Sequence, residues 1–194
     1  MSVTPERVAE RAYWLVPTLR ALPALILGLV ITFTADHSAR LGLVLFGLFA
    51  VLSGILVLGL NRRISDRVVR RIFLLLGLVG VICGCAALIG NAGGLGLLLF
   101  LLTVFAATTG FLELYAGLRT RGRLGLSRDW VVVGAFTAIA ALVFLLIPPD
   151  SLAAVGLLGA YGIMLGVYLA IAGLSLKWAT QDGSTAERST ESEK

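Results

Sequence analysis

Residues 41–90 read LGLVLFGLFAVLSGILVLGL, NRRISDRVVRR and IFLLLGLVGVICGCAALIG, in that order. Two apolar runs of about twenty residues therefore flank a break of eleven residues that holds five arginines. A helix of about 20 apolar residues matches a hydrocarbon core roughly 30 Å thick. Backbone N–H and C=O groups in that core must be satisfied within the segment, which a helix achieves alone. The stretch predicts two transmembrane helices joined by a basic loop.

The same alternation runs through most of the chain, which has 194 residues, 58% of them hydrophobic and 14% charged. A soluble domain carries about 25% charged residues. We therefore expect an all-α membrane protein. Pro17 and Pro23 are expected to bend its first helix, and Asp129 to cap its fifth. The six expected transmembrane helices cover residues 15–34, 41–60, 72–90, 95–117, 130–147 and 151–176.

Positive charge falls on one side of the predicted membrane. Fourteen of the sixteen Lys and Arg residues lie in the N-terminal segment, the second and fourth connections or the C-terminal tail, and the other two are Arg20 and Arg40. Short loops rich in Lys and Arg stay in the cytoplasm. We expect both termini to be cytoplasmic and the protein to lie in the plasma or inner membrane. This rule also accounts for the net charge of +5, so the expected partner is the lipid bilayer and not nucleic acid.

The chain divides into three parts by composition. Residues 1–13 are expected to form a cytoplasmic segment, and residues 14–177 the transmembrane domain. Residues 178–194 are rich in Ser, Thr and Glu, which predicts a disordered cytoplasmic tail.

An internal repeat divides the transmembrane domain further. A shift of 56 residues superimposes three hairpins without a gap, so that Gly28 falls on Gly84 and then on Ala140. Small residues spaced four apart allow helix backbones to approach closely in lipid. We expect three tandem two-helix hairpin repeats, over about 14–69, 70–125 and 126–177. The glycines expected to pack helices together are Gly28, Gly54, Gly84, Gly110, Gly162 and Gly166.

Several of these residues carry a family resemblance. Trp14, Arg20 and Gly28, then Gly47 and Gly54, and then TGFLELYAGLR at 109–119 resemble the HdeD-type acid-resistance membrane proteins, which are built from a short repeat of unknown function. The resemblance covers about residues 13–177. It implies a non-catalytic inner-membrane protein linked to acid or general stress survival. The chain departs from the family pattern at 34–36, where many members have a proline, and at Ser53, where many have an acid.

Arg20 and Glu113 are the ionisable residues within the apolar runs. A charge at the bilayer centre costs about 2.5–3.5 kcal/mol on insertion scales, so such residues usually face the bundle interior with a partner. Both lie about five residues from the cytoplasmic boundary, at a depth of roughly 7–9 Å. Three interpretations stay open: an ion pair between the first and fourth helices, an Arg20 that reaches the headgroups, or part of a proton or ion pathway.

His37, beside Asp36, is the only histidine and is a candidate pH sensor, since histidine titrates near pH 6.5. The alternative is a solvated loop residue without a role. Cys83 and Cys85 diverge by about 200° on a helix, so they favour neither a metal site nor a disulfide. One histidine does not support a typical metal site. We expect no metal, no cofactor and no enzymatic activity.

Two classes of function remain. The first is a non-catalytic membrane stress protein that acts through packing or partner binding. The second is a small channel or carrier for protons, ions or a small solute, with a pathway past Arg20 and Glu113. Polar residues near the expected midplane are few, which favours the first class. Association of copies into a homo-oligomer is compatible with either class.

Overall fold

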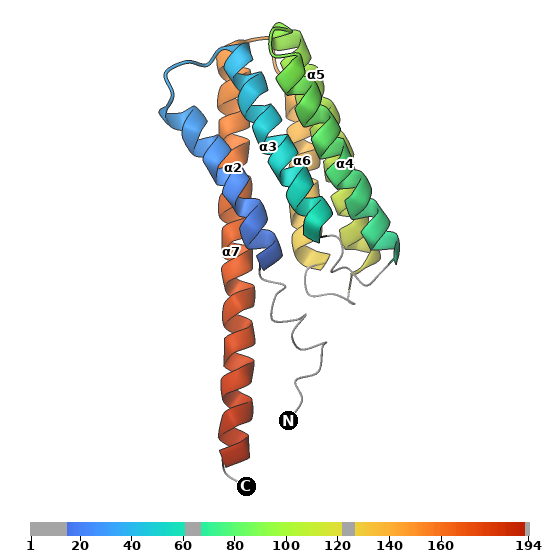
Figure 1. Cartoon of the computed structure of the whole chain (residues 1–194), viewed down its shortest axis with the longest axis vertical. Coiled ribbons are helices and arrows are strands. Elements are labelled where there is room, and N and C mark those ends of the chain that lie inside the picture. Colours follow the sequence, from blue (N-terminus) through green and yellow to red (C-terminus); the bar gives the residue numbers. More distant parts are fainter. Residues whose placement is uncertain (1–14, 61–66, 122–126, 193–194) are drawn as a thin grey trace.

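The computed structural model describes residues 15–60, 67–121 and 127–192, and within these ranges the chain forms six helices and no strand (Figure 1). The all-α class expected from the sequence is therefore confirmed. The helices are α2 (Leu15–Phe33), α3 (Ala39–Leu60), α4 (Arg67–Ile89), α5 (Gly94–Arg119), α6 (Ser127–Leu146) and α7 (Ser151–Ser192).

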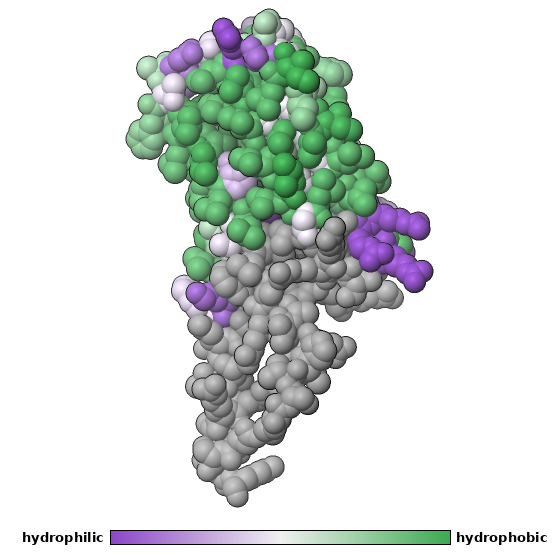
Figure 2. Space-filling view, viewed as in Figure 1, coloured by the Kyte–Doolittle hydropathy of each residue, from purple (hydrophilic) through white to green (hydrophobic). Residues whose placement is uncertain are grey.

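The outer surface of the bundle is apolar. Figure 2 shows a continuous hydrophobic band with hydrophilic residues gathered beyond it. Large apolar side chains such as Phe33 and Ile89 are 84% and 86% exposed. A soluble monomer rarely exposes an apolar surface of this extent. Helices α3 to α7 are each long and apolar enough to cross a membrane, while α2 is a shorter apolar helix.

Two helices begin earlier than the hydrophobicity predicts. α4 starts at Arg67, five residues before the apolar run at Ile72, and its first-turn arginines are exposed. This start agrees with an interfacial extension capped by Ser65 or Asp66, two residues that lie outside the described ones. Arginine is a good helix former, so the helix continues beyond the apolar run. α6 starts at Ser127, so Asp129 lies inside its first turn and does not cap it. The Asp129 carboxylate instead accepts a hydrogen bond from the Tyr168 hydroxyl at 3.0 Å.

α7 differs from the expectation at its C-terminal end. The tail expected to be disordered from residue 178 is helical as far as Ser192. No proline follows Ser151, and adding a residue to an existing helix costs far less than starting a new one. The helix therefore extends beyond the rest of the bundle (Figure 1).

Three pairs of helices pack most closely: α3 with α4, α5 with α6, and α7 with α2. Glycines make these contacts. A Cβ atom on Gly54 would lie 2.7 Å from the Gly77 carbonyl oxygen, and one on Gly162 would lie 2.9 Å from the Ala24 carbonyl oxygen. Close backbone approach of this kind drives helix association in lipid. The close pairs therefore join one predicted hairpin to the next, and α7 closes the ring on α2.

The contacts of α6 correct the predicted register. Gly54 packs against Gly77 and Val81, and a shift of 56 residues places the equivalents of these two at 133 and 137. Gly110 instead packs against Gly134 and Ala138, one residue further along. One residue turns a helix face by about 100°. The superposition without a gap is therefore wrong by one residue in α6, where Ala141 is buried and Ala140 only half-buried.

The packed core lies in two parts. The larger part includes the end of the bundle where α2 joins α3, with fully buried side chains such as Leu43, Phe46 and Leu98, and it continues along the bundle to Leu169. The Phe105 ring meets Phe46 edge-on at 5.4 Å between centroids. The other part lies at the end that carries most of the arginines, hereafter the basic end, where Phe73 packs against Trp130.

Candidate functional site

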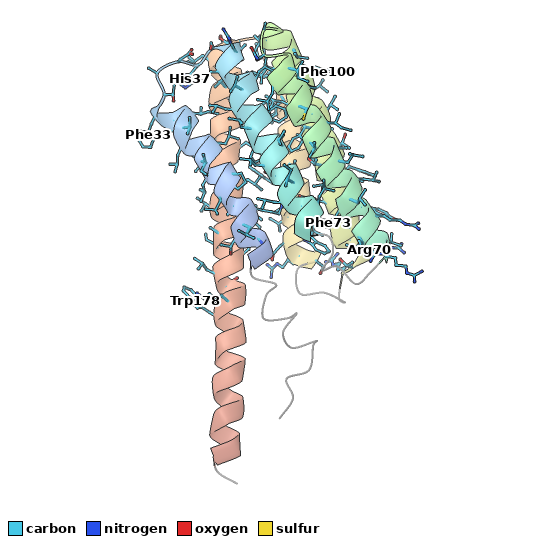
Figure 3. The ribbon with its side chains drawn as sticks, viewed as in Figure 1. Phe33, His37, Arg70, Phe73, Phe100 and Trp178 are labelled. Atoms are coloured by element: carbon cyan, nitrogen blue, oxygen red, sulfur yellow. The ribbon has the colours of Figure 1, made fainter. Side chains whose placement is uncertain are left out.

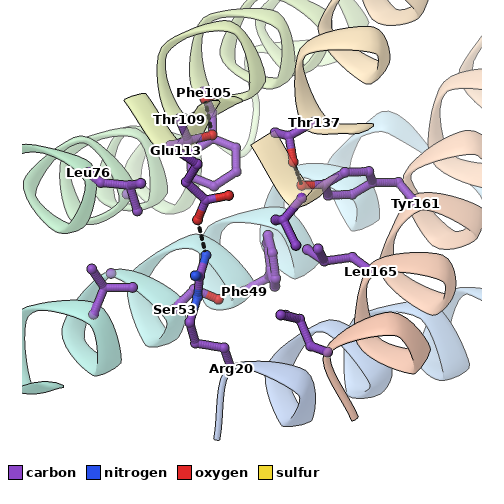
Figure 4. A pocket seen from close by; sticks show the side chains of 15 residues that line it. Arg20, Phe49, Ser53, Leu76, Phe105, Thr109, Glu113, Thr137, Tyr161 and Leu165 are labelled. Carbon is purple, nitrogen blue, oxygen red and sulfur yellow. Dashed lines mark hydrogen bonds and ion pairs between the residues drawn. The ribbon is translucent and has the colours of Figure 1, made fainter. Parts of the chain in front are cut away.

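A small cavity of about 30 Å³ lies inside the bundle, lined by apolar and polar side chains to which all six helices contribute. Figure 4 shows the side chains around it. Its charged and polar residues are Arg20, Ser53, Thr109, Glu113, Thr137 and Tyr161.

The structure brings Arg20 and Glu113 together. Arg20 lies in the second turn of α2, and Glu113 lies two turns before the end of α5, so the two reach each other at the same height. The Arg20 Nη2 donates a hydrogen bond to the Glu113 Oε1, and the two form an ion pair. Their side chains are 13% and 3% exposed. Arg20 therefore points into the bundle in this structure and not outward to the headgroup level.

Two polar atoms at the cavity have no hydrogen-bond partner among the described residues. They are the second carboxylate oxygen of Glu113 and the hydroxyl of Ser53. Glu113 is almost fully buried and Ser53 is partly buried. A buried polar atom without a partner costs about 1–3 kcal/mol. The cavity is thus chemically incomplete around the ion pair.

The polar lining ends in the middle of the bundle. Thr137 and Tyr161 share a hydrogen bond of 3.1 Å between their hydroxyls, and the Tyr161 ring stacks on Phe136. The Thr109 hydroxyl donates to the Phe105 carbonyl at 2.6 Å. The rings of Phe49 and Phe105, 6.1 Å apart, then meet the apolar core beyond them. We call these two rings and the buried side chains beyond them, such as Phe46, Leu43 and Leu98, the apolar plug, which separates the cavity from the end that carries the α2–α3 connection.

His37 lies at that far end of the bundle, well away from the ion pair (Figure 3). Its Nδ1 is 3.3 Å from the Ala35 carbonyl oxygen, while the neighbouring Asp36 carboxylate accepts a hydrogen bond from the Ser38 amide. The candidate pH sensor and the candidate ion pair are therefore separate features.

The two cysteines and the glycine-rich turn before α5 lie away from the cavity lining. Cys83 is buried and Cys85 exposed, and both are free thiols. No group of three metal-binding side chains occurs in the described part of the chain. Gly94 has φ +69°, the left-handed conformation that glycine favours, and it opens α5 after the turn. The turn between α4 and α5 therefore covers 90–93, and Gly94 is the first residue of the helix that follows.

All six glycines singled out in the sequence lie against a neighbouring helix. Gly134, the glycine with the shortest backbone approach, was not among the predicted packing residues. Gly134 and Ala138 have the four-residue spacing of small residues that marks such a face. Thr137, one turn further along α6, lines the cavity and was not predicted as a site residue.

The fold and the cavity define a class: a helical bundle of the multi-pass membrane type, with five helices long enough to span and a polar site enclosed among them. Within that class, no protein-family model, curated protein or solved structure matches the chain.

Proposed function

We propose that the chain is a six-helix protein of the plasma or inner membrane that supports survival under acid or general stress without catalysis, as its resemblance to the HdeD-type proteins implies. The apolar plug is the observation that favours this function over a channel. Ions and polar solutes cross a pore along water or polar groups, and a dry apolar constriction blocks their passage. Here the polar lining reaches only from the basic end to Tyr161.

The proposal includes three tandem hairpins with both termini in the cytoplasm. α2 has 19 residues, a length of about 28 Å that approaches the hydrocarbon thickness. The arginines at the basic end favour a cytoplasmic location for that end. The recurrence of glycine contacts in α3–α4, α5–α6 and α7–α2 supports three equivalent units, with the one-residue offset in α6.

Reporter fusions test this orientation. Alkaline phosphatase fused within residues 34–38, or within the 90–93 turn, is expected to be active, because both connections lie at the end opposite the basic one. The same enzyme fused after residue 194 is expected to be inactive, and green fluorescent protein at that position is expected to fluoresce. The reverse pattern contradicts the orientation.

The channel or carrier stays as the second candidate because a buried ion pair beside a cavity is an expensive feature for packing alone. Proton and ion flux through purified protein in liposomes separates the two. We expect no flux above that of protein-free liposomes, at neutral or acid pH, because the apolar plug closes the cavity. Flux that disappears on replacing Glu113→Leu together with Arg20→Leu favours the channel.

Acid survival of a deletion strain tests the stress role itself. We expect survival to fall and to recover when the wild-type chain is restored. His37→Gln, restored in the same way, shows whether the histidine takes part: an unchanged acid response removes it as a sensor. A deletion strain that survives acid as well as its parent contradicts the stress role.

A further inference from the structure

The polar cavity has unused hydrogen-bonding capacity on several sides. The free Glu113 oxygen and the Ser53 hydroxyl have no partner among the described residues. The Arg20 guanidinium carries five N–H donors. Glu113 accepts a hydrogen bond from one of its nitrogens, Nη2. The Thr109 hydroxyl donates to its own helix and still has lone pairs to accept with. The missing partner must therefore both donate and accept hydrogen bonds.

Size and charge limit what that partner is. To hold one water, a cavity needs about 10–15 Å³ of space that a water-sized sphere can occupy, together with two to four polar partners. The space of about 30 Å³ therefore has room for roughly two waters. Arg20 and Glu113 neutralise each other, so the cavity has no net charge to attract an ion.

The two charged residues of the cavity differ in exposure. Arg20 keeps 13% exposure, whereas Glu113, next to it on the inner side, keeps 3%. Beyond Thr137 and Tyr161 the apolar plug closes the bundle. The Arg20 side of the cavity is therefore the more exposed one, and apolar side chains close the far side.

We propose that this cavity is a water-binding site: a dead-ended vestibule in which about two water molecules link the free Glu113 oxygen, the Arg20 guanidinium and the Ser53 hydroxyl. The vestibule opens at the basic end only. This inference rests on the packing of the helices and not on the stress role, so the acid-survival experiment and the one below fail independently.

Silver ion, a thiol reagent of nearly the size of water, is a suitable probe. Ser53→Cys is made in a chain that also carries Cys83→Ala and Cys85→Ala, and is reconstituted in membranes. The free thiol that remains after silver treatment is measured with a fluorescent maleimide in SDS. A thiol in the apolar plug reacts only through local opening, so we expect Ser53→Cys to react at least roughly tenfold faster than Leu102→Cys in the same background. Thr109→Cys serves as a second vestibule position if Ser53→Cys does not fold.

Two further comparisons sharpen the test. Adding Arg20→Leu and Glu113→Leu to the Ser53→Cys chain is expected to slow the reaction toward the Leu102→Cys rate, because a small apolar cavity stays dry. Silver added only on the side of the basic end is expected to react, and silver on the opposite side is not. Equal rates at the vestibule and plug positions, an unchanged rate in the apolar double replacement, or access from the opposite side each overturn the proposal.

Discussion

Replacing Arg20→Leu alone, or Glu113→Leu alone, is expected to lower the free energy of unfolding by roughly 3–5 kcal/mol. Each single change leaves one charge inside the bundle without its partner. Both side chains are largely enclosed, at 13% and 3% exposure, so solvent does little to offset the loss. SDS-induced unfolding of the purified protein in mixed micelles measures the change, with Arg40→Leu, an exposed arginine, as the control.

The double replacement is expected to behave differently from either single one. A buried ion pair exchanged for apolar side chains is often neutral or stabilising. The positions 56 residues from Arg20 and Glu113 hold Leu76, Val57 and Leu169, three buried apolar side chains that show how such residues fit in this bundle. We therefore expect the double variant to unfold within about 1 kcal/mol of the wild type. If the loss in the double variant equals the sum of the losses in the two single variants, the two side chains do not stabilise each other.

Gly134→Ala is expected to give the second large effect, a loss of about 1–3 kcal/mol. A Cβ atom at this position would lie 2.4 Å from the Leu114 amide nitrogen and 2.9 Å from the Gly110 carbonyl oxygen. Both contacts are with backbone, so no side chain can rotate away, and α5 must separate from α6. The gain in helix propensity, up to about 1 kcal/mol, does not offset this cost.

Gly156→Ala is the matched control for Gly134→Ala. Gly156 also lies inside a helix, α7, but no atom lies within 4 Å of a Cβ built on it. The same substitution is expected to leave stability unchanged or to raise it slightly, since alanine is the better helix former. If Gly134→Ala and Gly156→Ala unfold at the same SDS concentration, the close approach of α5 and α6 does not stabilise the bundle.

The helices themselves were predictable from the sequence because the length of each apolar run, and the charged segments between the runs, determine them locally. α3 and α5 fall within two residues of the expected ends. The C-terminal end of α7 was not predictable in the same way, because the helix continues into polar sequence. Hydropathy records where the apolar run ends, and the helix ends only where a proline, a glycine turn or a change of chain direction interrupts it.

The partners of each helix could not be read from the sequence. Spaced small residues mark a packing face on α3 and equally on α4, and they do not say which neighbour each face meets. α7 packs against α2 because the helices together form a closed ring, which no local sequence pattern records. The one-residue offset in α6 has the same origin, since a register is set by contact with Gly110 and not by spacing along the chain.

Part of the cavity was predictable and part was not. Equal depth from the cytoplasmic boundary pointed to Arg20 and Glu113 as possible partners, because depth follows from residue count alone. The contact between Thr137 and Tyr161 was hidden. It depends on the rotation of α6 about its axis, and the predicted register placed that helix about 100° away from its observed face.

The contact between α2 and α7 has a consequence for biosynthesis. The two helices lie at opposite ends of the described chain, so α2 is synthesised long before the helix that it packs against. Until then its glycine-bearing face, with Gly28, has no α7 to pack against. A nascent chain that stops before α7 leaves this face uncovered, which gives membrane quality control a feature by which to distinguish an unfinished copy from a finished one.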